Sequence, residues 1–111
     1  MKFAIDAPHF GPYADARVLA GLAHDAEQAG WDGFFIWDHV MFAEPTPMVD
    51  ATVALTAIAM STERIRFGAM ITPLARRRPT KLARETVSLD RLSNGRLVLG
   101  VGLGADGAEY E

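Results

Sequence analysis

Asp38 and His39 are the adjacent residues of this chain that are best placed to carry out chemistry. They follow the apolar segment FFIW at residues 34–37, so they stand where a buried strand would end. A carboxylate beside an imidazole at such a position can transfer a proton or hold a polar ligand. The alternative is that both residues make turn and backbone hydrogen bonds in a loop, and their position alone favours neither interpretation.

A metal site is a weaker interpretation of the same region. His9 follows the first apolar segment and Asp6 lies within it, so both could approach Asp38 and His39. The close spacings typical of metal ligands, such as HxH, HExxH or paired cysteines, are missing, and the chain has no cysteine. We therefore expect no metal.

Glycines form a second candidate site in the segment GVGLGADG at residues 100–107, where Gly102, Gly104 and Gly107 fit the pattern GxGxxG. Glycine lets the backbone approach a phosphate or a ring closely and adopt positive φ. A dinucleotide fingerprint, however, follows a first strand and meets an acidic residue about 20 positions later. This segment follows a fourth strand and the sequence ends sooner, so a tight turn packed by small residues is the alternative.

Three arginines, Arg76, Arg77 and Arg78, precede Pro79 at the expected start of a helix. They could bind an anion together with the helix N-terminus, but the sequence favours a charged, solvated loop. We expect Trp31 and Trp37 to be packing residues.

The elements that must position these residues repeat at a regular interval. Apolar segments begin at residues 3, 34, 65 and 97, which are 31, 31 and 32 residues apart. A strand, a helix and two loops need roughly 30 residues. The segments at residues 3–5, 34–37, 65–71 and 97–101 are continuous apolar runs, which are typical of parallel strands covered on both faces.

Three helices are predicted between these strands, at residues 15–29, at residues 48–61 and from Pro79 to a stop at Asn94-Gly95. The second is apolar almost all round, which predicts deep burial. The predicted inner faces of the other two comprise Val18, Leu19, Leu22, Ala23 and Ala26 in the first, and Leu82, Ala83, Thr86, Val87 and Leu89 in the third. The class is therefore α/β with parallel strands.

Length limits how much of a fold these units complete. The chain has 111 residues and four predicted strands, whereas a closed (β/α)₈ barrel takes about 250 residues. The units would form about the first half of such a barrel, as one incomplete domain over residues 1–111. We favour an N-terminal part of a longer protein, and the alternative is two copies that pair into a homodimeric pseudo-barrel.

Composition excludes several classes of partner. Half of the residues are apolar and the net charge is −3, so there is no broad basic surface for nucleic acid. No run approaches the roughly 18 apolar residues of a membrane span, and the N-terminal segment, interrupted by Asp6, is not a signal peptide. These features predict a cytoplasmic protein without a nucleic-acid or membrane partner.

The whole chain resembles the N-terminal part of the luciferase-like flavin monooxygenase family, which includes bacterial luciferase and the deazaflavin-dependent oxidoreductases. Four short motifs carry the resemblance, and their order and spacing cover almost the entire chain. They are GWDGFFIWDHV at residues 30–40, RIRFGAMITP at 64–73, RRPTKLARETVSLDRLSNGRL at 77–97 and LGVGLG at 99–104. The resemblance implies a (β/α)₈ barrel that binds FMN or a deazaflavin (coenzyme F420) at its C-terminal mouth.

The resemblance also implies roles for individual residues. His39 would be the active-site histidine that handles a proton, and Asp38 would contact the cofactor. Ala69-Met70 would lie near a non-proline cis peptide that supports the ring. The remaining implied cofactor contacts are Met70, Thr72, Leu103 and Gly104.

One position departs from the family. Sugar-phosphate dehydrogenase members carry a catalytic glutamate after the last glycine of the fourth motif, and this chain has Ala105 there. The departure argues against that activity, although Asp106 or Glu109 could substitute from nearby.

Three hypotheses follow. The first is a flavin- or deazaflavin-dependent oxidoreductase, of monooxygenase type, acting on a small organic substrate. The second is a non-catalytic flavin-binding or self-associating half-barrel module. The third is a hydrolase that uses Asp38 and His39 on a metal.

Overall fold

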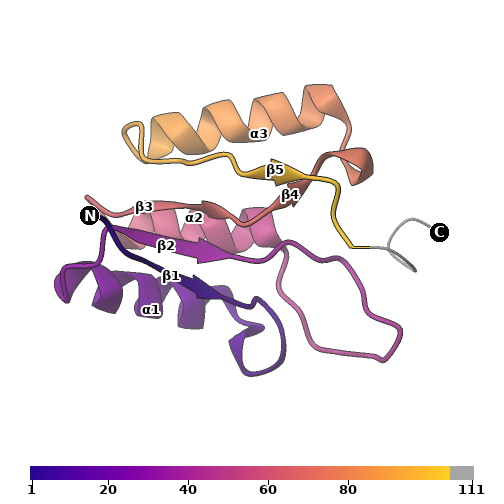
Figure 1. Cartoon of the computed structure of the whole chain (residues 1–111), viewed down its shortest axis with the longest axis horizontal. Helices are drawn as coiled ribbons and strands as arrows, with labels where there is room; N and C mark the ends of the chain where they lie inside the picture. Colours follow the sequence, from indigo (N-terminus) through magenta and orange to yellow (C-terminus); the bar gives the residue numbers. More distant parts are fainter. Residues whose placement is uncertain (106–111) are drawn as a thin grey trace.

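Parallel strands and helices alternate along the chain in the computed structural model, which describes residues 1–105 (Figure 1). The elements in chain order are β1 (Ala4–Ala7), the 3-10 helix η1 (Gly11–Tyr13), α1 (Ala16–Gln28), β2 (Gly33–Ile36), α2 (Ala51–Ser61), β3 (Arg66–Ala69), β4 (Thr72–Pro73), the 3-10 helix η2 (Leu74–Arg76), α3 (Pro79–Leu92) and β5 (Val101–Gly102). Strands β1, β2 and β3 form one sheet in that order, and β4 and β5 form a second. Every pairing between these strands is parallel, which confirms the predicted class.

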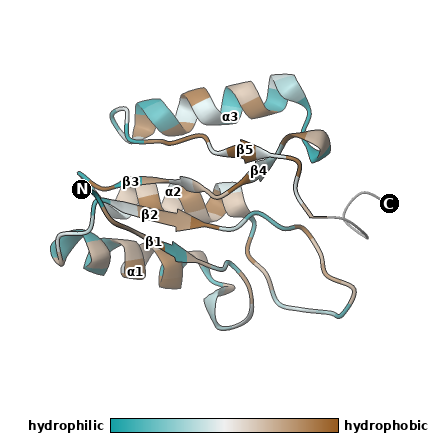
Figure 2. Ribbon diagram, in the orientation of Figure 1, coloured by the Kyte–Doolittle hydropathy of each residue, from teal (hydrophilic) through white to brown (hydrophobic). Residues whose placement is uncertain are grey.

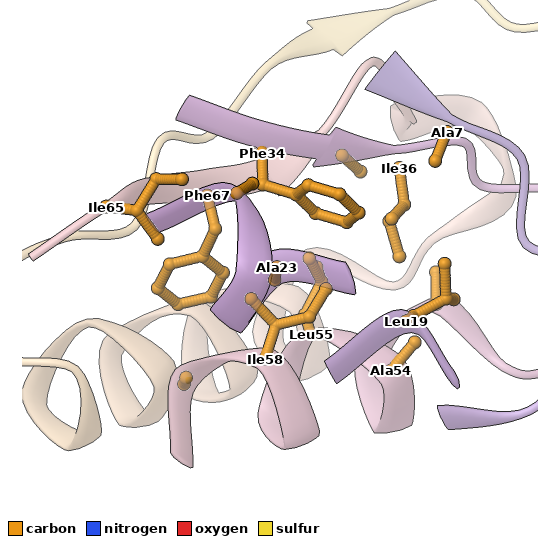
Figure 3. Close-up of a cluster of buried hydrophobic side chains, with 14 of the residues drawn as sticks. Ala7, Leu19, Ala23, Phe34, Ile36, Ala54, Leu55, Ile58, Ile65 and Phe67 are labelled. Carbon is orange, nitrogen blue, oxygen red and sulfur yellow. The ribbon is translucent and has the colours of Figure 1, made fainter. Parts of the chain in front are cut away.

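The hydrophobic core lies between the first sheet and the helices α1 and α2, which pack against each other (Figure 3). The strands contribute Phe34, Ile36 and Phe67, and the helices contribute Leu19 and Ile58; each is at most 1% exposed. Burying a side chain of this size stabilises the fold by about 1.5–3 kcal/mol. Strand β2 is central and is paired on both sides, by β1 and β3. Its carboxyl end is therefore well fixed, and Asp38 and His39 follow it closely.

The helix boundaries follow from capping residues that are visible in the sequence. The Asp15 carboxylate accepts a hydrogen bond from a backbone N–H in the first turn of α1, and Asp50 does the same for α2. Pro79 is the first residue of α3, and Asn94 and Gly95 stop it with φ angles of 57° and 80°. The predicted start of α2 at residue 48 was wrong, because the Asp50 cap places it at residue 51.

The predicted inner faces of the helices were partly wrong. In α1, Val18 and Leu22 are exposed and Ala20 is buried, so the buried stripe is rotated from the predicted one. In α2, Met60 is exposed although the whole helix was predicted to be buried. Figure 2 shows that α1 and α3 carry hydrophilic bands, in teal, which α2 largely lacks. The sequence of α2 therefore gave no sign of which residues face outward. In α3 one residue of the predicted face, Leu89, is buried.

The predicted third strand is divided in two. Strand β3 ends at Ala69, the Met70–Ile71 peptide bond is cis, and β4 begins at Thr72, where the strand was expected to stop. The expected non-proline cis peptide is therefore present, one bond beyond Ala69-Met70.

The predicted fourth strand is also interrupted, and its backbone approaches β3 closely. Leu97 pairs with Phe67 as an isolated bridge, and regular pairing resumes in β5. A Cβ atom on Gly68 would lie 2.0 Å from the carbonyl oxygen of Val98, and one on Gly100 would lie 2.8 Å from the carbonyl oxygen of Ala69. Glycine is therefore required on both strands for this contact.

Arg96 connects the C-terminal ends of α2 and α3 with the residue that precedes β3, from inside the protein. Its Nε donates to the carbonyl of Ser93 at 2.7 Å, and its two Nη groups donate to Thr62, Ile65 and Ala59 at 2.8–3.0 Å. All five N–H groups of the guanidinium are thereby used. Burial lowers the pKa of Arg96, and two of its acceptors are carbonyls at the C-terminal end of α2, so the cation also caps that helix.

Glu27 joins α1 to the start of the third strand segment at the same end of the molecule. Its carboxylate accepts hydrogen bonds from three consecutive backbone N–H groups, those of Glu63, Arg64 and Ile65. Desolvation by burial raises the pKa of Glu27, but these three hydrogen bonds outweigh it and bring the pKa below its ordinary value.

We predict that Arg96→Lys lowers the free energy of unfolding by about 2–4 kcal/mol. An ammonium group has three donors and cannot reach acceptors that a planar guanidinium satisfies, so buried carbonyls would lose their partners. Urea denaturation followed by circular dichroism measures the change. Arg84→Lys on the exposed face of α3 is the matched control and should change the stability by under about 0.5 kcal/mol. Equal effects of the two substitutions would contradict the assigned role of Arg96.

Candidate functional site

The carboxyl ends of the strands meet at one edge of the sheet, where the structure has an open cleft of about 360 Å³. We call it the His39 cleft. Its wall is mostly apolar, and its lining residues are Trp37, Asp38, His39, Met70, Ile71, Pro73, Gly104 and Ala105. They come from the segment after β2, the β3–β4 junction and the segment after β5, so three successive (β/α) units build the cleft. Figure 1 shows these segments leaving the strands on the same side.

Asp38 forms the floor of the cleft and is buried, with 3% of its side chain exposed. Arg76 donates to its Oδ1 at 2.6 Å and to its carbonyl oxygen at 2.9 Å, and Arg77 donates to Oδ2. The two arginine side chains are 10% and 19% exposed. The prediction that Arg76 and Arg77 belong to a solvated loop was therefore wrong, because an ion pair with a buried carboxylate draws both of them inward.

His39 is half-buried and is held through its backbone. Its N–H donates to Nε2 of His9 at 2.8 Å. Three aromatic rings surround the imidazole, with centroid distances of 4.9 Å to Phe42, 6.1 Å to Trp37 and 6.4 Å to Phe10. This arrangement presents the imidazole beside an apolar wall, where a proton donor or acceptor can act with little competition from water.

Trp37 forms one wall of the cleft and is itself fixed at both ends. Its indole Nε1 donates to the carboxylate of Asp6 at 3.0 Å, and its ring contacts Phe10 at 5.5 Å. About a third of Trp37 remains exposed, so the predicted packing role is accompanied by an open face toward the cleft. The adjacent Asp6 is therefore used in a hydrogen bond to Trp37.

The structure brings together some of the predicted cofactor contacts and separates others. Met70 and Gly104 line the His39 cleft with Asp38 and His39. Leu103 is 88% exposed and lies outside the lining. Thr72 is buried and does not line the His39 cleft; it lines a smaller pocket of about 30 Å³, which Asp38 also lines and which has room for about one water molecule.

The glycine-rich segment has mainly a packing role. A Cβ atom on Gly102 would lie 2.9 Å from the Ile71 side chain, so this glycine allows the strand to pass the β3–β4 junction. Gly104 has a φ of 86° and lines the cleft, and a side chain there would be strained. The alternative interpretation, a tight turn packed by small residues, is right about the close packing at Gly102 but wrong about the turn, because Gly102 lies in strand β5. Asp106, Gly107 and Glu109 lie outside the described residues.

The described residues also bear on metal binding and membrane insertion. Within residues 1–105, the structure has no group of three or more His, Cys, Asp or Glu side chains arranged to hold a metal ion. None of the helices in this part of the chain is long and apolar enough to cross a bilayer.

The fold and the cleft together define the class of this protein. Parallel (β/α) units with a cleft at the carboxyl ends of the strands are the arrangement in which (β/α) enzymes bind their ligands. The chain belongs to the luciferase-like monooxygenase family, whose sequence pattern matches residues 1–111. The family resemblance of the four motifs is therefore confirmed.

Three similar proteins show the range of this family. An F420-dependent glucose-6-phosphate dehydrogenase of Beutenbergia cavernae is 40% identical over 107 residues, which make up 94% of this chain and 31% of that protein. The coenzyme F420-dependent tetrahydromethanopterin reductase of Methanopyrus kandleri has a TM-score of 0.81 at 28% identity, covering 94% of this chain and 27% of its own.

The third similar protein is an FMN complex. It is the oxygenating constituent of 3,6-diketocamphane monooxygenase from Pseudomonas putida, with a TM-score of 0.74 at 26% identity, covering 86% of this chain and 26% of its own. The chain thus spans about a third of the length of the curated relatives that it matches.

We predict that Asp38→Asn lowers the free energy of unfolding by about 3 kcal/mol, because it leaves two largely buried guanidinium groups without their anion. Thermal or urea denaturation measures the loss. Asp25→Asn, an exposed position on α1, is the matched control and should change the stability by under about 0.5 kcal/mol. A neutral effect of Asp38→Asn would show that the ion pair is not what holds the floor of the cleft.

Proposed function

We propose that this chain forms the N-terminal part of the cofactor and substrate site of a flavin- or deazaflavin-dependent oxidoreductase. The observation that carries the proposal is the His39 cleft, in which one imidazole lies beside an apolar wall at the carboxyl ends of parallel strands, in a member of the luciferase-like family. The cofactors named for similar proteins are F420 and FMN. In this proposal the substrate is a small organic molecule.

The residues of the cleft fit the ring of such a cofactor. A tricyclic ring needs an apolar wall on one face and a few polar groups at its edge. Trp37, Met70 and Ile71 would supply the wall, with Met70 half-exposed and therefore available for contact. His39 and the backbone at Gly104 would face the edge. When bound, the cofactor would supply the two-electron redox chemistry.

Asp38 would act indirectly in this arrangement. Both of its carboxylate oxygens are bonded to arginines, so its contribution would be to fix the backbone that leads into His39. Thr72, which lines the smaller pocket together with Asp38, would also act indirectly. Leu103, which is largely exposed, would contact a cofactor only where the ring extends beyond the cleft.

Two reaction types remain candidates within this proposal. The monooxygenase type agrees with the FMN-bound neighbour, and hydride transfer without oxygen agrees with the F420-dependent relative. Ala105, which lines the cleft, offers no carboxyl group for acid–base work on a sugar phosphate. Oxygen uptake during turnover separates the two reaction types, because only a monooxygenase consumes oxygen.

The incomplete barrel is part of the same proposal. Within the described residues, β1 pairs with β2 alone, and β5 pairs with β4 alone. We propose that further (β/α) units close the barrel onto these edges. The alternative is a self-associating half-barrel without catalysis, which predicts a dimer in native mass spectrometry that binds a flavin and turns over no substrate.

We predict saturable binding of FMN or of F420 to the protein, measured by titration and cofactor fluorescence. Met70→Ala should weaken that binding about tenfold or more, since a buried methionine side chain is worth about 1.5–3 kcal/mol. Met60→Ala is the matched control, because Met60 is also largely exposed to solvent, at 69% against 54% for Met70, but lies on the outer surface of α2. An equal effect of the two variants, or no binding of either cofactor, would contradict the assigned site.

We also predict that His39→Ala lowers kcat of the whole enzyme by about 10²–10⁴-fold, the usual contribution of a positioned proton donor or acceptor. Cofactor affinity should change less than turnover, because the apolar wall is retained. His24→Ala, on the outer face of α1, is the control. Unchanged turnover in His39→Ala would remove the proton-handling role.

A further inference from the structure

His9 is fully buried and uses both of its ring nitrogens. Nδ1 lies 2.7 Å from the carbonyl oxygen of Val49, and Nε2 lies 2.8 Å from the backbone nitrogen of His39. A carbonyl oxygen can only accept and an amide N–H can only donate, so Nδ1 carries the proton and Nε2 is bare. The two partners therefore select one neutral tautomer of the imidazole.

The chain segment that carries His9 is anchored independently of this side chain. The N–H of Val49 donates to the His9 carbonyl at 3.0 Å, and the N–H of Gly11 donates to Pro47 at 2.9 Å. The long loop after β2 thus returns to lie along residues 9–11, as its path in Figure 1 shows. This pairing gives the His9 ring a fixed place from which to hold the backbone at residue 39.

We propose that His9 is a positioning residue for His39: in its neutral form it accepts the backbone N–H of His39 and so sets the direction in which that imidazole faces the cleft. This proposal rests on the function proposed for the His39 cleft in one respect: that function gives the positioned imidazole its catalytic use. Asp38 supports the same backbone from the other side through Arg76 and Arg77. The rings of His9 and His39 lie nearly parallel, with their centroids 6.2 Å apart and an interplanar angle of 21°.

The geometry makes this positioning sensitive to pH. A proton added at Nε2 would point at the N–H of His39, so two donors would face each other and the hydrogen bond would break. The charged and titratable groups around the ring are Asp38, His39 and Asp50. Burial lowers the pKa of His9, and although the Val49 hydrogen bond and the two carboxylates oppose this, the net shift is downward from 6.5.

The sign of the stability change follows from this shift. Below pH 6.5 the unfolded chain takes up a proton at this residue, while the folded protein still excludes it. Stability contributed by the neutral ring is therefore complete above pH 6.5 and declines as the pH falls from there toward the lower pKa of the folded state.

Nuclear magnetic resonance of the ¹⁵N-labelled protein tests the proposal without any cofactor, so a failure here is distinct from a failure of the proposed function. We expect the nitrogen shifts of His9 to report the Nδ1–H tautomer at pH 7, and a scalar coupling to connect His9 Nε2 with the amide nitrogen of His39. A bare Nδ1, or a charged ring at pH 7, would overturn the proposal.

Three variants separate positioning from general packing. His9→Asn keeps a donor near the Val49 carbonyl but removes the acceptor, and we expect amide exchange at His39 to accelerate about tenfold. His9→Gln restores an acceptor that cannot be protonated, so protection at His39 should return and lose its pH dependence. His24→Asn, whose ring also approaches a backbone carbonyl through Nδ1, should leave His39 unchanged.

Two results with these variants would contradict the proposal. Equal protection of the His39 amide in His9→Asn and in the unchanged protein would overturn it, as would a failure of His9→Gln to remove the pH dependence in a folded protein. If His9→Asn does not fold, the scalar coupling between His9 Nε2 and the His39 amide in the unchanged protein still decides: its presence supports the proposal and its absence overturns it.

Discussion

The ion pair between Asp38 and the two arginines is the interaction on which the His39 cleft depends. It joins the end of β2 to the segment that leads from β4 into α3, so it fixes the relative position of two successive (β/α) units where they meet the cleft. Buried ion pairs bring little net stability when compared with apolar packing. This ion pair fixes the position of the chain at Asp38. Each carboxylate oxygen has a guanidinium partner, and the backbone carbonyl of Asp38 accepts a third hydrogen bond.

The two ends of the sheet use buried charges differently. At the amino-terminal end, Arg96 and Glu27 direct their charges at backbone groups. At the carboxyl end, Asp38 is neutralised by other side chains, and the space beside it stays open. Such a division is expected of (β/α) folds, in which one end of the strands carries stability and the other carries the ligand site. Stability lost at the amino-terminal end should therefore be separable from changes in the cleft.

Sequence patterns predicted the order of strands and helices because capping residues and apolar runs are local signals. Asp15 and Pro79 mark helix starts through their own side chains. Contacts between distant segments were harder to predict. Nothing local shows that Arg76 and Arg77 turn inward, since three adjacent arginines normally remain in water, and the attraction comes from a carboxylate 38 residues earlier. The close approach of the fourth strand segment to β3 likewise depends on Gly68, in another strand.

Asp38 and His39 show why an adjacent pair need not act as a pair. The Asp38 carboxylate is paired with Arg76 and Arg77, whereas the neighbouring imidazole lies among aromatic rings beside the cleft. The sequence alone left open which of the two would do chemistry. His9 was harder to interpret, because a single histidine after a strand has no local partner; its partners, Val49 and the backbone of His39, come from two other parts of the chain. In the proposed site we therefore expect the imidazole beside the cleft to be the chemical group, and the carboxylate and the second imidazole to set its direction.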